Sequence, residues 1–143
     1  MARANVLLVD DEAPFVEALT RRLSKRELDI TPAHDGAQAL EKLGQSRMFE
    51  VVILDVKMPG MDGIETLRQI KTDHPLVEVI MLTGHATVES AIEGMKLGAF
   101  DYLMKPCDID ELVAKVEQAA ARKHVQEEKI TLARIKEIAA RRD

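Results

Sequence analysis

Aromatic residues, cysteine and long apolar runs are scarce in this sequence. Its 143 residues include no tryptophan, one tyrosine and one cysteine. Because Cys107 has no second cysteine to pair with, no disulfide can form within the chain, and a cytoplasmic location is expected. No apolar run approaches the roughly 20 residues of a membrane-spanning helix, so we expect no membrane association. The start, MARANVLLVDDE, reaches acidic residues too early for a secretion signal.

Positive charge is also scarce over most of the chain. The formal net charge is −5, and residues 121–143, with seven Lys/Arg and four Asp/Glu, contribute +3, which leaves −8 on residues 1–120. An acidic body argues against direct binding of nucleic acid. Residues 110–142 contain neither proline nor glycine, so one helix is expected to run past the domain. We therefore expect a domain over residues 1–122 and a C-terminal helical extension or linker over residues 123–143.

What the sequence does contain is a regular alternation of short apolar runs and amphipathic stretches. Val51–Leu54 is an apolar run that ends at Asp55, with a Pro59–Gly60 turn soon after, as expected of a strand buried on both faces. Further strands are predicted over residues 5–9, 28–33, 77–82 and 99–104. Helices are predicted over about 15–25, 37–43, 63–70, 88–97 and from about 108, the second of them ending at Gly44. Five strand–helix units predict an α/β domain with a parallel sheet and helices on both faces.

Polar residues suited to chemistry follow four of the five predicted strands. In chain order they are Asp10 and Asp11, Asp55, Thr83 and Lys105. The carboxyl ends of parallel strands share one edge of the sheet, so these side chains are expected to meet there. Three carboxylates repel one another unless a cation such as Mg²⁺ lies among them, while a hydroxyl and an ammonium group suit phosphoryl oxygens.

Each of these residues alone has an ordinary structural explanation. The paired acids fit solvated loop positions, the threonine fits a helix entry, and the lysine fits a surface position before a proline. Asp55 fits a strand end before a turn, or else a nucleophile or metal ligand. The sequence favours a functional site because all five residues occupy strand ends.

The sequence resembles the receiver domains of two-component response regulators over residues 4–122. The matching pieces are LLVDDE (7–12), VVILDVKMPGMDG (51–63), VIMLTGHA (79–86) and GAFDYLMKP (98–106). The segment TGHATVESAIEGMKLGAFDYLMKP is most similar to receivers that precede sigma-54-dependent activator domains. The resemblance implies a flavodoxin-like, doubly wound α/β fold, with five parallel strands in the order 2-1-3-4-5 and, here, an extended C-terminal helix.

The resemblance also implies a chemical role for the acids at the strand ends. Asp55 is the expected phosphoacceptor, taking a phosphoryl group from a histidine kinase. Mg²⁺ is the expected cofactor, held by Asp10, Asp11, Asp55 and the backbone carbonyl of Lys57. The domain is then a signalling module, not an enzyme, since it catalyses only its own phosphorylation and autodephosphorylation.

The same resemblance implies a switch. Thr83 and Lys105 are expected to bind phosphoryl oxygens, and the rotamer of Tyr102 is expected to follow the position of Thr83. The surface that changes is that of the fourth helix, fifth strand and fifth helix, which would control a partner or an effector domain on the full-length chain, with a role in transcription regulation. His85 and Lys57 lie two residues after Thr83 and Asp55 and could influence access of water to the site.

Two other functions remain open from the residues alone. A phosphatase of the haloacid dehalogenase type also uses an aspartate nucleophile at a strand end, but it needs a second acid two residues later, where this chain has Lys57. A flavodoxin-like flavin binder needs a phosphate-binding loop after the first strand, where Asp10, Asp11 and Glu12 would repel a phosphate.

Homodimerisation is expected through the final helix, its face toward the preceding strand and the tail beyond it. Ile130, Ala133, Ile135 and Ile138 lie beyond the point where the domain closes its core, and pairing with a second copy would bury some of them. A solvated, frayed tail is the alternative, because the apolar positions keep no clean heptad through residues 123–128.

Overall fold

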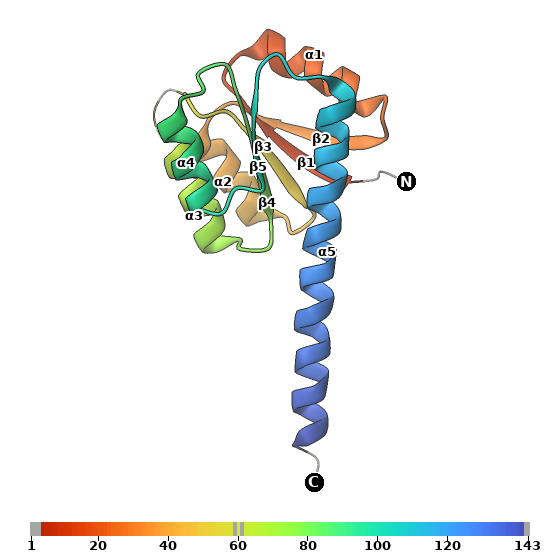
Figure 1. The fold of residues 1–143 in the computed structure, drawn as a ribbon. Helices are drawn as coiled ribbons and strands as arrows, with labels where there is room; N and C mark the ends of the chain where they lie inside the picture. Colours follow the sequence, from red (N-terminus) through yellow and green to blue (C-terminus); the bar gives the residue numbers. More distant parts are fainter. Residues whose placement is uncertain (1–3, 59, 61, 142–143) are drawn as a thin grey trace.

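The computed structural model describes residues 4–58, 60 and 62–141, and it contains one sheet flanked by helices (Figure 1). Five parallel strands lie in the order β2-β1-β3-β4-β5, which confirms the predicted fold and strand order. The strands are β1 (Ala4–Val9), β2 (Leu28–Ala33), β3 (Val51–Leu54), β4 (Glu78–Thr83) and β5 (Asp101–Met104). The helices are α1 (Ala13–Ser24), α2 (Gly36–Gln45), α3 (Gly63–Asp73), α4 (Val88–Lys96) and α5 (Ile109–Ala140). Pro59 of the predicted turn lies outside the described residues.

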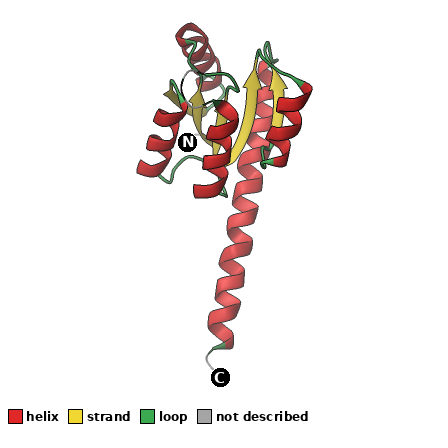
Figure 2. Ribbon diagram, turned by 90° about the vertical axis from the view of Figure 1, so that its left-hand side faces the viewer, coloured by secondary structure: helices red, strands yellow, loops and turns green. Residues whose placement is uncertain are grey.

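The helices form two layers, one on each face of the sheet (Figure 2). Along β1, Val6 and Leu8 pack on the side of α1 and α5, whereas Leu7 and Val9 pack on the side of α2 and α3. This alternation follows from the two-residue period of a strand, and it explains why β1 is apolar at consecutive positions. Each face of the sheet therefore has its own core, with the sheet packed between the two helix layers.

The starts of four helices are fixed by side-chain caps. A carboxylate or hydroxyl oxygen accepts a backbone N–H of the first turn in each case, and the capping residues are Asp35, Asp62, Thr87 and Asp108. These caps satisfy N–H groups that have no partner inside the helix. Three of these helices, α3, α4 and α5, directly follow the strand ends or loops that carry candidate residues.

Several predicted boundaries were wrong. Strand β4 spans Glu78–Thr83 instead of residues 77–82, so Thr83 is its last residue, and α3 continues to Asp73. Helix α2 continues through Gly44 to Gln45 instead of ending at the glycine, and nothing lies within 4 Å of the position that a Cβ of Gly44 would take. Glycine weakens a helix but does not end it unless the backbone turns to a positive φ. Strand β5 begins at Asp101, not Ala99, because the Ala99 N–H donates to the Gly94 carbonyl at the end of α4.

Helix α5 runs on well beyond the sheet, as the sequence predicted, and projects from the domain (Figure 1). Its buried residues end at Ala120. Just past that point, Arg122 Nε lies 3.0 Å from Glu78 Oε2, in an ion pair without hydrogen-bond geometry, and His124 Nε2 lies 2.6 Å from Glu50 Oε2. These contacts tie the base of the extension to the amino-terminal ends of β3 and β4. Within the part of the chain that the structure describes, no helix is long and apolar enough to span a membrane.

Candidate functional site

Three carboxylates meet at the carboxyl-terminal edge of the sheet. Asp10 follows β1 and Asp55 follows β3, and each is held by a backbone bond: the Asp10 N–H donates to the Ala33 carbonyl (3.1 Å) and the Asp55 N–H to the Val9 carbonyl (3.0 Å). One oxygen from each of Asp10, Asp11 and Asp55 lies within 4.8 Å of the others. Asp10 and Asp55 are only 1% and 2% exposed, whereas Asp11 is exposed. The parallel sheet thus gathers the three predicted acids into one cluster.

Lys105, after β5, supplies positive charge to this cluster. Its Nζ lies 2.6 Å from Asp10 Oδ2, 3.3 Å from Glu12 Oε1 and 3.9 Å from Asp55 Oδ2. Its backbone N–H donates to the Thr83 carbonyl at 2.9 Å, which fixes the point from which the side chain starts. The contact with Glu12 was not predicted, because Glu12 carries no signal in the sequence beyond its place next to the two acids.

Burial and charge oppose each other at this site. Burial raises the pKa of Asp10 above its ordinary value, an effect that outweighs the hydrogen bond from Lys105. Burial on its own would lower the pKa of Lys105, but the hydrogen bond to Asp10 and the charges of Asp10 and Asp55 together raise it. Lys105 therefore stays charged at neutral pH, and deprotonation of the buried Asp10 carboxyl destabilises the folded chain.

The acidic cluster has the donor set of a divalent cation site. Asp55 Oδ1 is buried and has no hydrogen-bond partner among the described residues. A buried carboxylate oxygen without a donor is costly, and a hard cation bound by oxygen ligands removes that cost. Asp10, Asp11 and Asp55 together supply the few carboxylates that Mg²⁺ typically takes.

Gly63 allows α3 to begin directly against Asp55. A Cβ at this position would lie 2.0 Å from the Asp55 carbonyl oxygen and 2.6 Å from the Val56 Cα, so only glycine fits without a backbone shift. Sequence reasoning placed Gly63 in the helix but missed this close approach. A glycine at the first position of a helix that follows a candidate nucleophile is the signal that could have revealed it.

The predicted switch residues lie on the two strands next to the acids. Thr83 is fully buried, and its Oγ1 accepts the backbone N–H of His85 at 3.0 Å. Tyr102 pairs with Met81 across β4 and β5, and its phenol oxygen lies 2.6 Å from Ser90 Oγ in the first turn of α4. The Ser90 contact was not predicted. The structure places Tyr102 against α4, with its ring next to Gly94.

An open hollow of about 530 Å³ leads to Asp55 from solvent. Its wall includes Asp11, Glu12, Lys57 and His85. Lys57 and His85 are both exposed and stand where a group approaching Asp55 would pass. Of the predicted residues, Asp11, Lys57 and His85 therefore line one accessible hollow together with Asp55.

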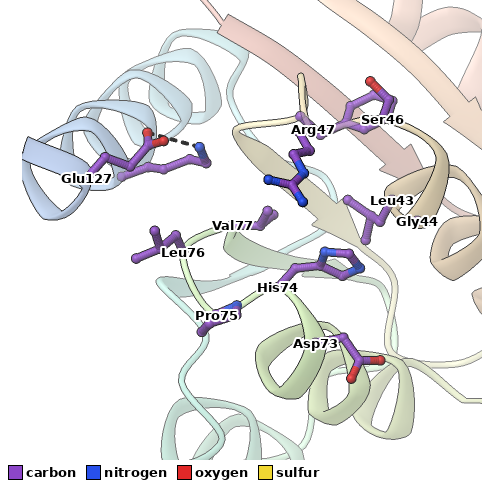
Figure 3. Close-up of a pocket in the computed structure, with 12 residues that line it drawn as sticks. Leu43, Gly44, Ser46, Arg47, Asp73, His74, Pro75, Leu76, Val77 and Glu127 are labelled. Carbon is purple, nitrogen blue, oxygen red and sulfur yellow. Dashed lines mark hydrogen bonds and ion pairs between the residues drawn. The ribbon is translucent and has the colours of Figure 1, made fainter. Parts of the chain in front are cut away.

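A separate hollow of about 440 Å³ lies at the other end of the strands, next to their amino-terminal ends (Figure 3). The loops before β3 and β4 line it, together with the base of the α5 extension. Arg47 and His74 lie on its wall, and Lys123 pairs with Glu127 at 3.0 Å on the side of α5. Because it lies across the sheet from Asp55, it has no part in the chemistry of the acidic cluster.

Comparisons with known proteins agree with this arrangement. A sequence profile described as the response regulator receiver domain matches residues 6–117. The chain is 44% identical over 128 residues to the DNA-binding transcriptional regulator NtrC of Escherichia coli, covering 90% of this chain and 27% of that protein. It is 40% identical over 120 residues to the transcriptional regulatory protein ZraR of Escherichia coli, covering 84% of this chain and 27% of that protein. The chain thus spans about a quarter of the length of these relatives.

Solved structures of similar proteins share the fold. A response regulator receiver domain protein from Clostridium thermocellum has a TM-score of 0.82 at 34% identity, covering 86% of this chain and 98% of that one. NtrX from Brucella abortus has a TM-score of 0.82 at 32% identity, covering 93% of this chain but 30% of that one. The acidic cluster, the fold and these matches lead to the same conclusion: the chain belongs to the response regulator receiver domains, the phosphoacceptor switches of two-component signalling.

Proposed function

We propose that Asp55 is the phosphoacceptor of this chain and that a histidine kinase is the donor. The observation that carries this proposal is the position of Asp55, at a strand end, buried between two further acids and 3.9 Å from a lysine ammonium group. An oxygen of the carboxylate attacks the phosphorus of a phosphohistidine, forming an O–P bond. The P–N bond breaks, its electron pair stays on the imidazole nitrogen, and an acyl phosphate results.

Lys105 and Thr83 support the transferred group in this proposal. Lys105 offsets the negative charge that develops on the phosphoryl oxygens, and Thr83 offers a hydroxyl donor. Little covalent chemistry is required of the protein, so positioning and charge neutralisation are its main contributions. In the same way the domain removes its own phosphoryl group by admitting water, so its catalysis acts only on itself.

Magnesium is the proposed cofactor of the acidic cluster. Asp10, Asp11, Asp55 and the backbone carbonyl of Lys57 would hold it, and the unpartnered Asp55 oxygen supports this ligand set. When bound, Mg²⁺ supplies positive charge beside the transferred phosphoryl group. The residues of the chain provide the oxygens and orient the aspartate.

Phosphorylation then alters the surface of α4, β5 and α5. It replaces a carboxylate by a group of about −1.5 to −2 charge with strong acceptor oxygens. Thr83 moves toward that group, and Tyr102, on the adjacent strand, follows into the space it leaves. This packing change is the proposed output. Residues 1–122 form the receiver, and residues 123–143 carry the change toward a partner or an effector domain, as the regulator names of the relatives suggest.

The proposed assembly is a homodimer through the α5 extension. Five large apolar residues there are 39–56% exposed: Val125, Ile130, Leu132, Ile135 and Ile138. A second copy is the proposed occupant because Val125, Leu132 and Ile135 follow the seven- and three-residue spacing of a helix–helix seam. The extension carries acidic residues as well as basic ones. Glutamates of one copy can therefore lie near lysines and arginines of the other across a two-fold axis.

The phosphoacceptor assignment is tested by incubating the chain with Mg²⁺ and a small phosphodonor. The expected product is a stoichiometric, hydroxylamine-labile phosphoprotein, and Asp55→Asn should abolish it without loss of the fold. A phosphatase would instead turn over many equivalents of donor. Labelling of the Asp55→Asn variant at the wild-type level would sink the assignment.

A further inference from the structure

The ammonium group of Lys105 lies over the aromatic ring of Phe15. The distance from Nζ to the ring centroid is 3.9 Å, well inside the roughly 6 Å within which a ring face attracts a cation. Phe15 belongs to the first turn of α1 and is half-buried against the core beneath that helix. The Lys105 side chain is only 13% exposed, so the contact is largely removed from water, where such attraction is stronger.

The ring holds a side chain that reaches across the sheet. Lys105 follows β5 at one edge, whereas its nearest carboxylate, Asp10, follows β1, and β3 and β4 lie between these two strands. The lysine side chain has four methylene carbons and many rotamers, so an ammonium group held only by its own chain could occupy several positions. The face of the Phe15 ring under the ammonium group restricts the positions that this group can take.

Phe15 differs in kind from the other partners of Lys105. The ammonium group also contacts Asp10 (2.6 Å), Glu12 (3.3 Å) and Asp55 (3.9 Å), which are acids within or beside the proposed cation and phosphoryl site. A cation or phosphoryl group bound there would change the charge and the free oxygen atoms with which these acids attract the lysine ammonium group. The ring carries no charge and lies outside the acidic cluster, so its hold on Lys105 persists through the reaction.

We propose that Phe15 is a positioning residue for phosphoryl transfer, whose ring keeps the Lys105 ammonium group directed at Asp55. This inference rests on the proposed role of Lys105 in binding phosphoryl oxygens. Through this one aromatic side chain, helix α1 contributes to the site of phosphoryl transfer. The sequence did not single out Phe15 for this role, because its helical spacing with Leu19 and Leu23 already explains it as a core residue.

The test compares ring-free and ring-bearing variants of the full chain. Phe15→Met and Phe15→Leu remove the ring and keep an apolar side chain, and Phe15→Tyr keeps the ring. With Mg²⁺ and acetyl phosphate, the ring-free variants should be phosphorylated about two- to thirtyfold more slowly, the range expected for loss of a cation–π contact. Phe15→Tyr should retain the wild-type rate within about twofold.

Phe100 offers a matched control. Like Phe15 it is half-buried and packs against the same core, but its ring lies near Arg122, 5.8 Å away, not near Lys105. Phe100→Met should leave the phosphorylation rate unchanged. A direct readout is the proton NMR shift of the Lys105 methylene next to Nζ, which the ring should displace upfield in the wild type and in Phe15→Tyr only.

The outcomes separate this inference from the proposed function. If Asp55→Asn abolishes labelling but both ring-free variants react at the wild-type rate, the role of Phe15 is wrong and the phosphoacceptor stands. An equal loss in Phe100→Met, or an unchanged methylene shift in the ring-free variants, overturns the role of Phe15 as well. Labelling of Asp55→Asn at the wild-type level removes the proposed function itself.

Discussion

The phenol oxygen of Tyr102 and the hydroxyl oxygen of Ser90 lie 2.6 Å apart. Ser90 also belongs to the capping box of α4, in which its backbone N–H donates to Thr87 Oγ1 and its Oγ accepts the Thr87 N–H. The Ser90 hydroxyl thus contacts the phenol in addition to its partners on Thr87, and either hydroxyl of the Ser90–Tyr102 pair can be the donor. The side chain of the proposed switch residue is therefore bonded to the group that starts α4.

This contact predicts that the Tyr102 hydroxyl stabilises the first turn of α4. Tyr102→Phe removes one hydrogen bond, and amide exchange at Glu89, Ser90 and Ala91 should accelerate about two- to tenfold, the range for one net hydrogen bond. Exchange is measured by NMR on the wild type and the variant. In a Ser90→Ala background the same Tyr102 change should add nothing; additive effects of the two changes would show that the contact is incidental.

The raised pKa of Asp10 predicts a pH-dependent gain in stability for Asp10→Asn. A carboxyl whose pKa rises on folding holds its proton more tightly in the folded chain, so the wild type loses stability as the pH rises from 3.8, the ordinary value, through the raised value. Asp10→Asn has no such loss and keeps its volume. At neutral pH it should be more stable by about 0.5–2 kcal/mol. Urea unfolding over this pH range measures the difference, and a gap that stays constant with pH would contradict the explanation.

Metal dependence is expected to follow the acidic cluster. Asp11→Ala removes an exposed carboxylate of the cluster and should weaken Mg²⁺ binding and slow phosphorylation, because fewer oxygen ligands remain. Asp73→Ala, at the opposite edge of the sheet, is the matched control and should behave as the wild type. Phosphorylation at the full rate in EDTA would remove the metal from the mechanism.

The lifetime of the acyl phosphate is expected to depend on Lys57 and His85. Both line the hollow that leads to Asp55, and both are positioned to influence the approach of water. After removal of the donor, decay of the label in Lys57→Ala and His85→Ala should differ from wild type by a factor of about two or more, since a 0.4 kcal/mol change in barrier already gives twofold. Lys96→Ala on α4 serves as the exposed-lysine control. Unchanged half-lives in both variants would show that Lys57 and His85 are ordinary solvated residues without a role in dephosphorylation.

Oligomeric state is expected to follow the α5 extension. The chain 1–143 should form a dimer at tens of micromolar, and a version that ends at Arg122 should be a monomer, because the five exposed apolar residues are gone. Leu132→Lys with Ile135→Lys tests the same seam without shortening the chain. Light scattering measures the mass. Monomers throughout, with and without phosphorylation, would contradict pairing through this helix.

The sequence predicted those elements whose signal is local. Strands β2 and β3 have the predicted boundaries, because each is a short run with clear flanking residues, and Asp10, Asp55 and Lys105 meet because parallel strand ends share an edge. Gly44 was misread because a glycine signals a helix end only when the backbone turns there, which depends on tertiary packing.

Contacts between distant side chains could not be predicted in this way. Phe15 under Lys105 depends on where α1 lies and on a lysine rotamer, and the pairing of Ser90 with Tyr102 depends on how closely α4 approaches β5. Neither leaves a periodic or spaced signal in the chain.

The ion pairs at the base of α5 turn the extension into a lever. Ala140 lies twenty residues after Ala120 on α5, a rise of about 30 Å at 1.5 Å per residue. A tilt of about 5° at the base would carry the tip sideways by about 2.6 Å over that length. Because Arg122 and His124 bind acids at the starts of β4 and β3, the fulcrum lies on the central strands of the sheet. A small rotation of the helix base against the sheet would thereby be magnified at the tip of the extension.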